Sequence, residues 1–246
     1  MAKKLLSVIV PAYKERTIKR DLEDIDNTLR EGLPEDYNYE IICVVDGSPD
    51  DTEEQARKVK SPKVKVLSYE KNMGKGFAVR YGIEHSKGEL VSFLDAGREI
   101  HSRGIMMLMA HMDWYNADII VGSKMHPVSQ VKYPIIRRIL SLGYYLITKI
   151  LLRVAVRDTQ SGLKIFKRKV LEKILPKLHV QRYAMDVEML ALAEYFGFRR
   201  IFEAPVEIQY NFKSLTHAST LKDILRMFWD TFFVFYRLYI LHYYDK

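Results

Sequence analysis

Two kinds of hydrophobic pattern alternate along the first half of the chain. Short apolar runs rich in β-branched residues occupy positions 5–13, 39–47, 64–69, 89–97 and 117–124, and stretches with helical periodicity lie between them. The runs are continuously apolar, which is typical of strands buried on both faces in a parallel sheet. The pattern therefore predicts an α/β fold with a Rossmann-like, mostly parallel sheet and helices on both faces.

The pattern changes after about residue 130. A basic loop leads into an amphipathic helix, a hairpin-like segment at 158–168, two helical segments, a strand pair near 198–210 and a long aromatic helix. We therefore divide the chain into a domain of residues 1–210, with halves 1–125 and 126–210, and a C-terminal amphipathic helical region over 211–246.

Polar residues gather where the predicted strands end. Residues 11–15 follow the first strand, 46–51 the second, 95–99 the fourth and 122–124 the fifth. Doubly wound sheets bind ligands at the carboxyl ends of their strands. These four segments are therefore expected to face one crevice.

Two turns, one at 72–76 and one at 46–51, could bind a nucleotide. The stretch NMGKG places two glycines and Lys75 where a helix begins, so backbone N–H groups and one cation could hold a phosphate. The spacing is not that of a P-loop, and a simple tight turn is the alternative. Asp46 ends its strand and could bind a nucleobase, although VVDGSPDDT is also a good helix start.

The charge of the chain restricts its partners. The formal net charge is +8, which favours a polyanion: nucleic acid, an anionic membrane surface or a phosphorylated substrate. The basic residues accompany long apolar helices, a pattern that disfavours nucleic acid. The most apolar segments, 139–156 and 227–244, are interrupted by charged side chains, so neither is expected to span a bilayer.

Six stretches together resemble the family 2 glycosyltransferases with the nucleotide-sugar-binding GT-A fold. They are VIVPAYKE, VVDGSPDDT, NMGKG, FLDAG, VGSK and DTQSGLKIFKR, in this order over about residues 5–170. Within the family the chain is most similar to the polyprenyl-phosphate mannose and glucose synthases. The resemblance implies an inverting transfer of one hexose from UDP-glucose or GDP-mannose to dolichyl or another polyprenyl phosphate, at the cytoplasmic face of a membrane.

The resemblance also implies roles for individual residues in the nucleotide-sugar half, 1–125. The base and ribose would be surrounded by Pro11, Tyr13, Glu15 and Asp46, the nucleotide by Lys75, and the nucleotide or its metal by Asp95. Relatives often carry two adjacent aspartates where this chain has Val45 and Asp46, so the sequence leaves the base open.

The stretch FLDAGRE departs from the usual Asp-x-Asp metal motif. Mg²⁺ or Mn²⁺ under a diphosphate needs oxygen ligands, and Gly97 offers none where the second aspartate would stand. By resemblance Glu99 can reach the metal, so we predict a rebuilt site with Glu99 and Asp95. Arg98 neutralising the diphosphate directly is one alternative. A catalytically silent nucleotide-sugar-binding protein is the other.

The acceptor half, 126–210, determines the acceptor class. A phosphate acceptor is already an anion and needs cations to align it, whereas a hydroxyl acceptor needs a general base. The segment 123–141 supplies the candidates Lys124, Lys132, Arg137, Arg138 and Ser141. By resemblance Arg137 and Ser141 would hold the lipid phosphate as catalytic residues. A solvated basic face is the alternative.

Two carboxylates in AMDVEML are candidates for a base. Asp186 and Glu188 lie in a helical pattern, where a base for a hydroxyl acceptor and a structural carboxylate are both consistent with the sequence. The family places an acidic residue here near the acceptor, so Asp186 joins Asp95, Arg137 and Ser141 as a catalytic candidate.

Two amphipathic segments fit a lipid acceptor. Residues 137–153 and 224–244 combine apolar and aromatic surface with Lys and Arg, as helices lying in a membrane interface do. We therefore expect peripheral contact with a membrane surface. Packing within the protein or in a homodimer is the alternative.

Overall fold

The computed structural model describes residues 3–97, 99–129, 135–180, 184–208 and 221–245, and of 135–138 and 221–225 only the backbone. The strands are β1 (Lys4–Ala12), β2 (Tyr37–Asp46), β3 (Val64–Tyr69), β4 (Leu90–Leu94), β5 (Ile119–Ser123), β6 (Leu163–Lys167) and β7 (Ile201–Pro205). The α-helices are α1 (Ile18–Gly32), α2 (Thr52–Arg57), α3 (Lys75–Glu84), α4 (Gly104–Trp114), α5 (Ile135–Leu152), α6 (Arg168–Ile174), α7 (Met185–Tyr195) and α8 (Leu221–Phe235). Short turns of other helix types are η1 (Leu175–Lys177), η3 (Tyr236–Ile240) and η4 (Tyr243–Asp245).

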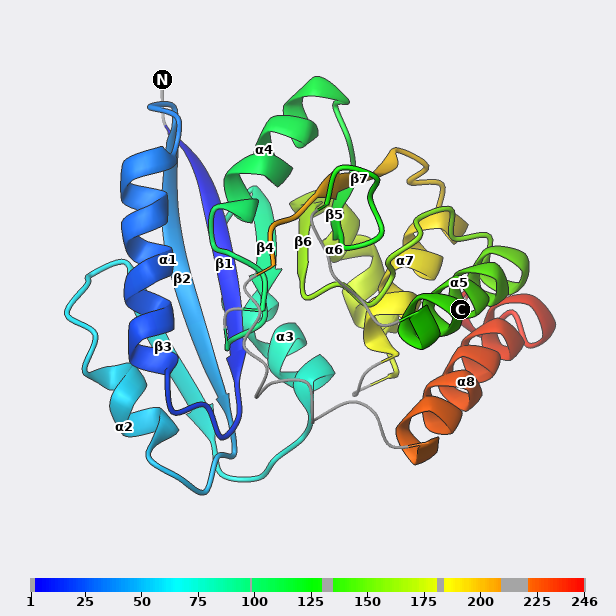
Figure 1. The fold of residues 1–246 in the computed structure, drawn as a ribbon, viewed down its shortest axis with the longest axis horizontal. Helices are drawn as coiled ribbons and strands as arrows, with labels where there is room; N and C mark the ends of the chain where they lie inside the picture. The colour runs from blue at the N-terminus through cyan, green and yellow to red at the C-terminus, as the bar shows by residue number, and fades with distance from the viewer. Residues whose placement is uncertain (1–2, 98, 130–134, 181–183, 209–220, 246) are drawn as a thin grey trace.

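The strands form one 7-stranded sheet in the order β3-β2-β1-β4-β6-β5-β7 (Figure 1). The pairs β1–β2, β1–β4, β2–β3 and β5–β7 are parallel, and β6 runs antiparallel to both β4 and β5. The predicted α/β class with a mostly parallel sheet is confirmed.

Helices cover both faces of the sheet because side chains alternate between the faces of each strand. On β1, Val8 and Val10 face an apolar layer that contains buried residues of α1, α2 and α4. Ile9 faces the opposite layer, which contains buried residues of α3, α6, α7 and α8. The runs that form β1, β2, β4 and β5 are therefore mostly buried on both faces, as expected, whereas the edge strand β3 is only partly buried.

The second half pairs differently from the sequence prediction. The segment 158–168, expected as a hairpin, contributes a single strand, β6, whose Ile165 pairs with Ser92 of β4 and Ile120 of β5. The expected strand pair near 198–210 contributes β7, which pairs with β5, and an isolated bridge joins Ile208 to Ile100. Both predictions assumed local partners, whereas the partners are distant in sequence.

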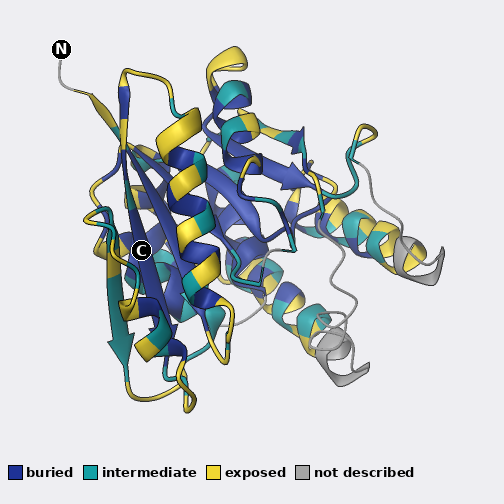
Figure 2. Cartoon of the chain, turned by 60° about the vertical axis from the view of Figure 1, so that its left-hand side comes forward, coloured by how far each residue is buried: buried dark blue, intermediate teal, exposed yellow. Residues whose placement is uncertain are grey.

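Helices α5 and α8 lie side by side at one end of the molecule (Figure 1). The Tyr144 ring lies 5.7 Å from the Phe228 ring, and the Tyr144 and Thr231 hydroxyl oxygens are 2.9 Å apart. The outer sides of both helices carry exposed residues (Figure 2). Among the residues described, no helix has the length and apolar character that crossing a bilayer requires.

Candidate active site

A lysine and an aspartate meet at the carboxyl ends of the strands. Asp95 directly follows β4, and Lys75 is the first residue of α3. The Lys75 ammonium lies 2.8 Å from Asp95 Oδ1 and 3.8 Å from Asp186 Oδ2. Burial opposes the charge of Lys75, but the two carboxylates outweigh it and raise the pKa of Lys75. This lysine is therefore a permanent cation at the crevice.

Asp46 builds the turn that places Lys75. Its carboxylate is buried at the end of β2 and accepts hydrogen bonds from the N–H of Met73 at 2.7 Å and of Gly74 at 2.9 Å. The Asn72 amide donates to the same carboxylate at 3.0 Å. Gly74 has a φ of 95°, which favours glycine. A contact of Asp46 with the nucleobase stays a prediction.

The ends of β1 and β2 are tied together, which gathers the predicted base and ribose residues. The N–H of Glu15 donates to Thr52 Oγ1 at 2.9 Å, and the N–H of Lys14 donates to Ser48 Oγ at 2.8 Å. Pro11 is the second-last residue of β1, and the Tyr13 side chain is exposed just after this strand. Pro11, Tyr13 and Glu15 therefore lie along the edge that also holds Asp46.

The backbone conformation at position 97 favours glycine. Its φ is 88°, and its N–H donates to Asp21 Oδ2 at 3.0 Å. A Cβ atom at this position would lie 3.1 Å from Glu15 Oε2. A side chain at position 97 would therefore be strained and would crowd an existing carboxylate, so the turn itself disfavours a second aspartate here.

The second predicted metal ligand lies beside a predicted acceptor cation. Glu99 Oε1 and the Lys124 ammonium are 3.0 Å apart. Lys124 follows β5, and its backbone N–H donates to Asp158 Oδ2 at 2.8 Å. The structure thus brings the segments after β4 and β5 together. Arg98, between Gly97 and Glu99, lies outside the described residues.

The donor set suits a metal that arrives with a diphosphate. Asp95 and Glu99 offer carboxylate oxygens, the donors that Mg²⁺ and Mn²⁺ prefer. Within the part of the chain that the structure describes, no cluster of three His, Cys, Asp or Glu residues could form a protein cage for an ion. One or two carboxylates suffice when phosphate oxygens and water complete the shell, so the residues present fit such an ion.

The structure describes only some of the residues that are predicted to bind the lipid phosphate. Ser141 is half-buried on α5. Lys132 and the side chains of Arg137 and Arg138 lie outside the described residues. The roles of Arg137, Arg138 and Ser141 therefore stay predictions.

Asp186 belongs to a buried pair that the sequence did not reveal. It lies in the first turn of α7, and its Oδ1 is 2.6 Å from the ammonium of Lys164. Burial lowers the pKa of Lys164, and the Asp186 carboxylate opposes that shift. The sequence feature that could have indicated this pair is a lysine inside the apolar run GLKIF, which forms a buried strand.

Glu188 ties three segments of the core together. Its carboxylate accepts hydrogen bonds from the N–H of His179 at 3.1 Å, the N–H of Val180 at 2.8 Å and the hydroxyl of Tyr244 at 2.6 Å. Burial, together with the nearby carboxylate, raises the pKa of Tyr244. Glu188 therefore holds η4 and the loop before α7 in place, which is a structural role.

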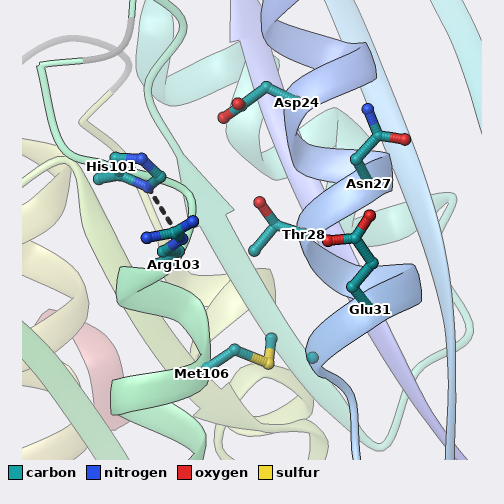
Figure 3. A pocket seen from close by; sticks show the side chains of 8 residues that line it. Asp24, Asn27, Thr28, Glu31, His101, Arg103 and Met106 are labelled. Atoms are coloured by element: carbon teal, nitrogen blue, oxygen red, sulfur yellow. Dashed lines mark hydrogen bonds between the residues drawn. The ribbon is translucent and has the colours of Figure 1, made fainter.

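A separate hollow of about 450 Å³ lies between α1 and the segment 101–106 (Figure 3). It is lined by residues of both charges, among them Asp24, Glu31, His101 and Arg103. In Figure 3 His101 and Arg103 lie across the hollow from the labelled residues of α1, among them Asp24 and Glu31. None of the residues predicted for the nucleotide, the metal or the acceptor lines it, so it is distinct from the crevice.

Comparison with known proteins matches the chain to one family. The family model described as Glycosyl transferase family 2 matches residues 7–175. The dolichyl-phosphate beta-glucosyltransferase of Dictyostelium discoideum is 34% identical over 202 residues, covering 77% of this chain and 62% of that protein. That of Homo sapiens is 35% identical over 211 residues, covering 78% and 64%. The chain therefore spans less than two thirds of the length of these relatives.

Solved structures share the fold. The glucosyl-3-phosphoglycerate synthase of Mycobacterium tuberculosis, in complex with Mn²⁺, uridine diphosphate and glucosyl-3-phosphoglycerate, superposes with a TM-score of 0.69 at 18% identity. The match covers 95% of this chain and 79% of that one. The predicted GT-A architecture is confirmed, and that neighbour is solved with a divalent metal and UDP bound together.

Proposed function

The chain belongs to glycosyl transferase family 2, and from this premise we propose that it transfers one glucose from UDP-glucose to a dolichyl or other polyprenyl phosphate. Relatives that are 34% and 35% identical are named as dolichyl-phosphate beta-glucosyltransferases, which favours glucose over mannose. A UDP complex within the same fold supports the choice of nucleotide.

The contacts of the two candidate general bases support a phosphate acceptor rather than a hydroxyl acceptor. Asp186 lies within 2.6 Å of one ammonium and 3.8 Å of another, and Glu188 accepts hydrogen bonds from two backbone N–H groups and Tyr244. Both carboxylates are buried and already engaged, so neither is well placed to remove a proton from a hydroxyl acceptor. A lipid phosphate attacks as an anion and needs no base.

The reaction then depends on alignment of charges. An oxygen of the lipid phosphate attacks the anomeric carbon of glucose from the face opposite the leaving group. The bond from that carbon to the diphosphate oxygen breaks, and UDP leaves with the electron pair. Lys75 would stabilise the charge that grows on the diphosphate, and Lys124 would align the incoming phosphate.

A divalent metal would be held by Asp95 and Glu99. When bound, it would supply further neutralisation of the departing diphosphate. We propose Mg²⁺ or Mn²⁺ as this ion because both of its protein ligands would be carboxylates. Arg98 and the metal act on the same charge, so removal of the metal distinguishes their contributions.

We also propose that the chain works as a peripheral protein on the cytoplasmic face of a membrane. The exposed sides of α5 and α8 carry large apolar side chains, including Ile150 at 76% and Trp229 at 61% exposure. Lys149, Arg153 and Arg237 accompany them and would favour anionic headgroups. Such a surface would bring the crevice to the lipid phosphate.

The test is transfer of labelled glucose from UDP-glucose to polyprenyl phosphate in detergent, with Mg²⁺, Mn²⁺ or EDTA. We expect metal-dependent transfer, reduced at least about tenfold by Glu99→Ala because the metal loses one of its two carboxylates. Glu172→Ala, which removes an exposed carboxylate on α6, is the matched control and should leave the rate unchanged.

Two results would contradict this proposal. Transfer that survives EDTA would assign the diphosphate charge to Arg98 and the lysines. Tight UDP binding without transfer to any polyprenyl phosphate would identify a silent nucleotide-sugar-binding protein. If GDP-mannose is the better donor, the proposed sugar and nucleobase are wrong, and the proposed acceptor, a polyprenyl phosphate, still holds.

A further inference from the structure

Strand β6, which lies between β4 and β5, carries a fully buried lysine beneath the crevice. The side chain of Lys164 has 0% exposure, so it cannot touch a nucleotide, a sugar or a lipid. Its ammonium donates to the Ser161 carbonyl at 2.6 Å and to Asp186 Oδ1 at 2.6 Å, and it lies over the Phe93 ring. A lysine buried this deeply is costly and needs compensating partners.

One branch of this network leads to Lys75. Asp186 is 3% exposed and places Oδ1 on Lys164 and Oδ2 3.8 Å from the Lys75 ammonium. An unpaired carboxylate in this position would be costly to keep ionised, so Lys164 maintains the charge that faces Lys75. Lys75 is thereby held between Asp186 below and Asp95 at the crevice.

The other branch leads to Asp95. The Ser161 carbonyl that accepts from Lys164 precedes Gly162, whose own carbonyl accepts the N–H of Asp95 at 3.0 Å. The Asp95 carboxylate lies directly against Gly162, where a Cβ atom would collide with it. The position of the Ser161–Gly162 backbone therefore determines the position of Asp95.

We propose that Lys164 is a positioning residue for the diphosphate subsite, acting through Asp186 on Lys75 and through Ser161 and Gly162 on Asp95. The inference rests on the proposed function, because it assigns Lys75 and Asp95 to the phosphates of the donor. It adds a residue that contacts neither substrate yet aligns both members of the pair that receives the diphosphate. Such preorganisation is the form of support that electrostatic stabilisation requires.

The test measures binding of two ligands that differ only in the diphosphate. Wild type and Lys164→Met/Asp186→Asn are titrated with UDP in the presence of Mn²⁺ and with uridine. We expect the double variant to fold, because both buried charges are removed together. Its Kd for UDP should rise about tenfold and its Kd for uridine should stay within about twofold, because only the phosphate contacts lose their alignment.

Arg168→Met is the matched control. Arg168 follows β6 at the opposite end of the strand, where it donates to the carbonyl of Gly88 and the hydroxyl of Ser86. Its loss should lower stability without changing either Kd. This control separates misalignment of the phosphate site from a general weakening around β6.

Two outcomes would overturn the proposal. A folded double variant that binds UDP as tightly as wild type would show that Lys164 aligns nothing there. An equal loss of UDP and uridine affinity would show a merely structural role. If the double variant does not fold, Lys164→Gln decides in its place, because its amide can still donate a hydrogen bond to Ser161 or Asp186 while the ammonium that pairs with Asp186 is gone.

The proposed function is checked separately. Wild type is first titrated with UDP and GDP, and the variants are compared with whichever diphosphate binds, against its own nucleoside. A wild type that binds this diphosphate but transfers nothing to polyprenyl phosphate contradicts the proposed function and leaves the comparison of variants valid.

Discussion

Single residues in this crevice are explained by backbone geometry as much as by side-chain chemistry. From the sequence, Gly97 is a missing metal ligand, because the pattern compares side chains alone. The structure gives it a φ of 88° next to Glu15, a conformation that other residues adopt only with strain. The departure from Asp-x-Asp therefore follows from the shape of this turn.

Substitution of Gly97 should lower the stability of the protein, whatever its effect on catalysis. We expect Gly97→Ala to lower the free energy of unfolding by about 1–2 kcal/mol, the cost of a left-handed backbone in a residue with a Cβ atom. Gly97→Asp should cost more, because it adds a charge beside Glu15. Urea unfolding measures both.

Gly143→Ala is the control for that comparison. Gly143 lies within α5, where an added Cβ atom would meet nothing within 4 Å, so alanine should stabilise the helix by about 0.5–1 kcal/mol. A Gly97→Ala variant as stable as wild type would mean that the turn can relax to another conformation.

At the scale of elements, local patterns predicted the strands but not all of their partners. The five runs predicted as strands in the first half each coincide with a strand, β1 to β5. The partners of β6 and β7 depend on contacts between residues far apart in the chain, which periodicity does not encode. For the same reason Asp186 was predicted as a site residue without its partner Lys164, since the two meet only when β6 and α7 pack together.

The hydrogen bond from Tyr244 to Glu188 should stabilise the end of the chain. Tyr244→Phe removes a buried 2.6 Å hydrogen bond to a carboxylate, and we expect it to lower the free energy of unfolding by about 2 kcal/mol. Hydrogen exchange of the α8 and η3 amides should become faster, because η4 is less firmly held. Tyr243→Phe, at an exposed neighbour, should change neither. Equal effects of the two variants would contradict this role.

At the scale of the molecule, the crevice and the apolar helices form two separate surfaces. The crevice holds lysines and carboxylates in pairs, so its charges can be redistributed when a charged substrate enters. The exposed sides of α5 and α8 carry aromatic and aliphatic side chains that the rest of the described chain leaves uncovered. The sequence indicated both surfaces but not which side chains of α5 and α8 face outward.

Binding to lipid vesicles should depend on these helices. We expect cosedimentation with vesicles of phosphatidylcholine and phosphatidylserine, weaker at high salt because part of the attraction is electrostatic. Trp229→Ser/Phe233→Ser should reduce binding several-fold, since both side chains are exposed on α8. Trp114→Ser, which removes a 71% exposed tryptophan from α4, should not.

If α5 and α8 form a homodimer interface instead of a membrane surface, different results are expected. A chain that sediments as a dimer, ignores vesicles and becomes monomeric in the Trp229→Ser/Phe233→Ser variant would assign this surface to a homodimer. Analytical ultracentrifugation beside the vesicle assay distinguishes the two.

The position of β6 also affects how the chain is made on the ribosome. Strands β1 to β4 can pair as soon as they emerge, but β4 and β5 are not neighbours, and the strand that joins them is synthesised only after α5. During that interval the nascent sheet has an open edge at β4, and open edges can pair with other chains. Arrival of β6 closes this edge and joins β5 to the sheet, and β7, which is synthesised later, pairs with β5 to complete it.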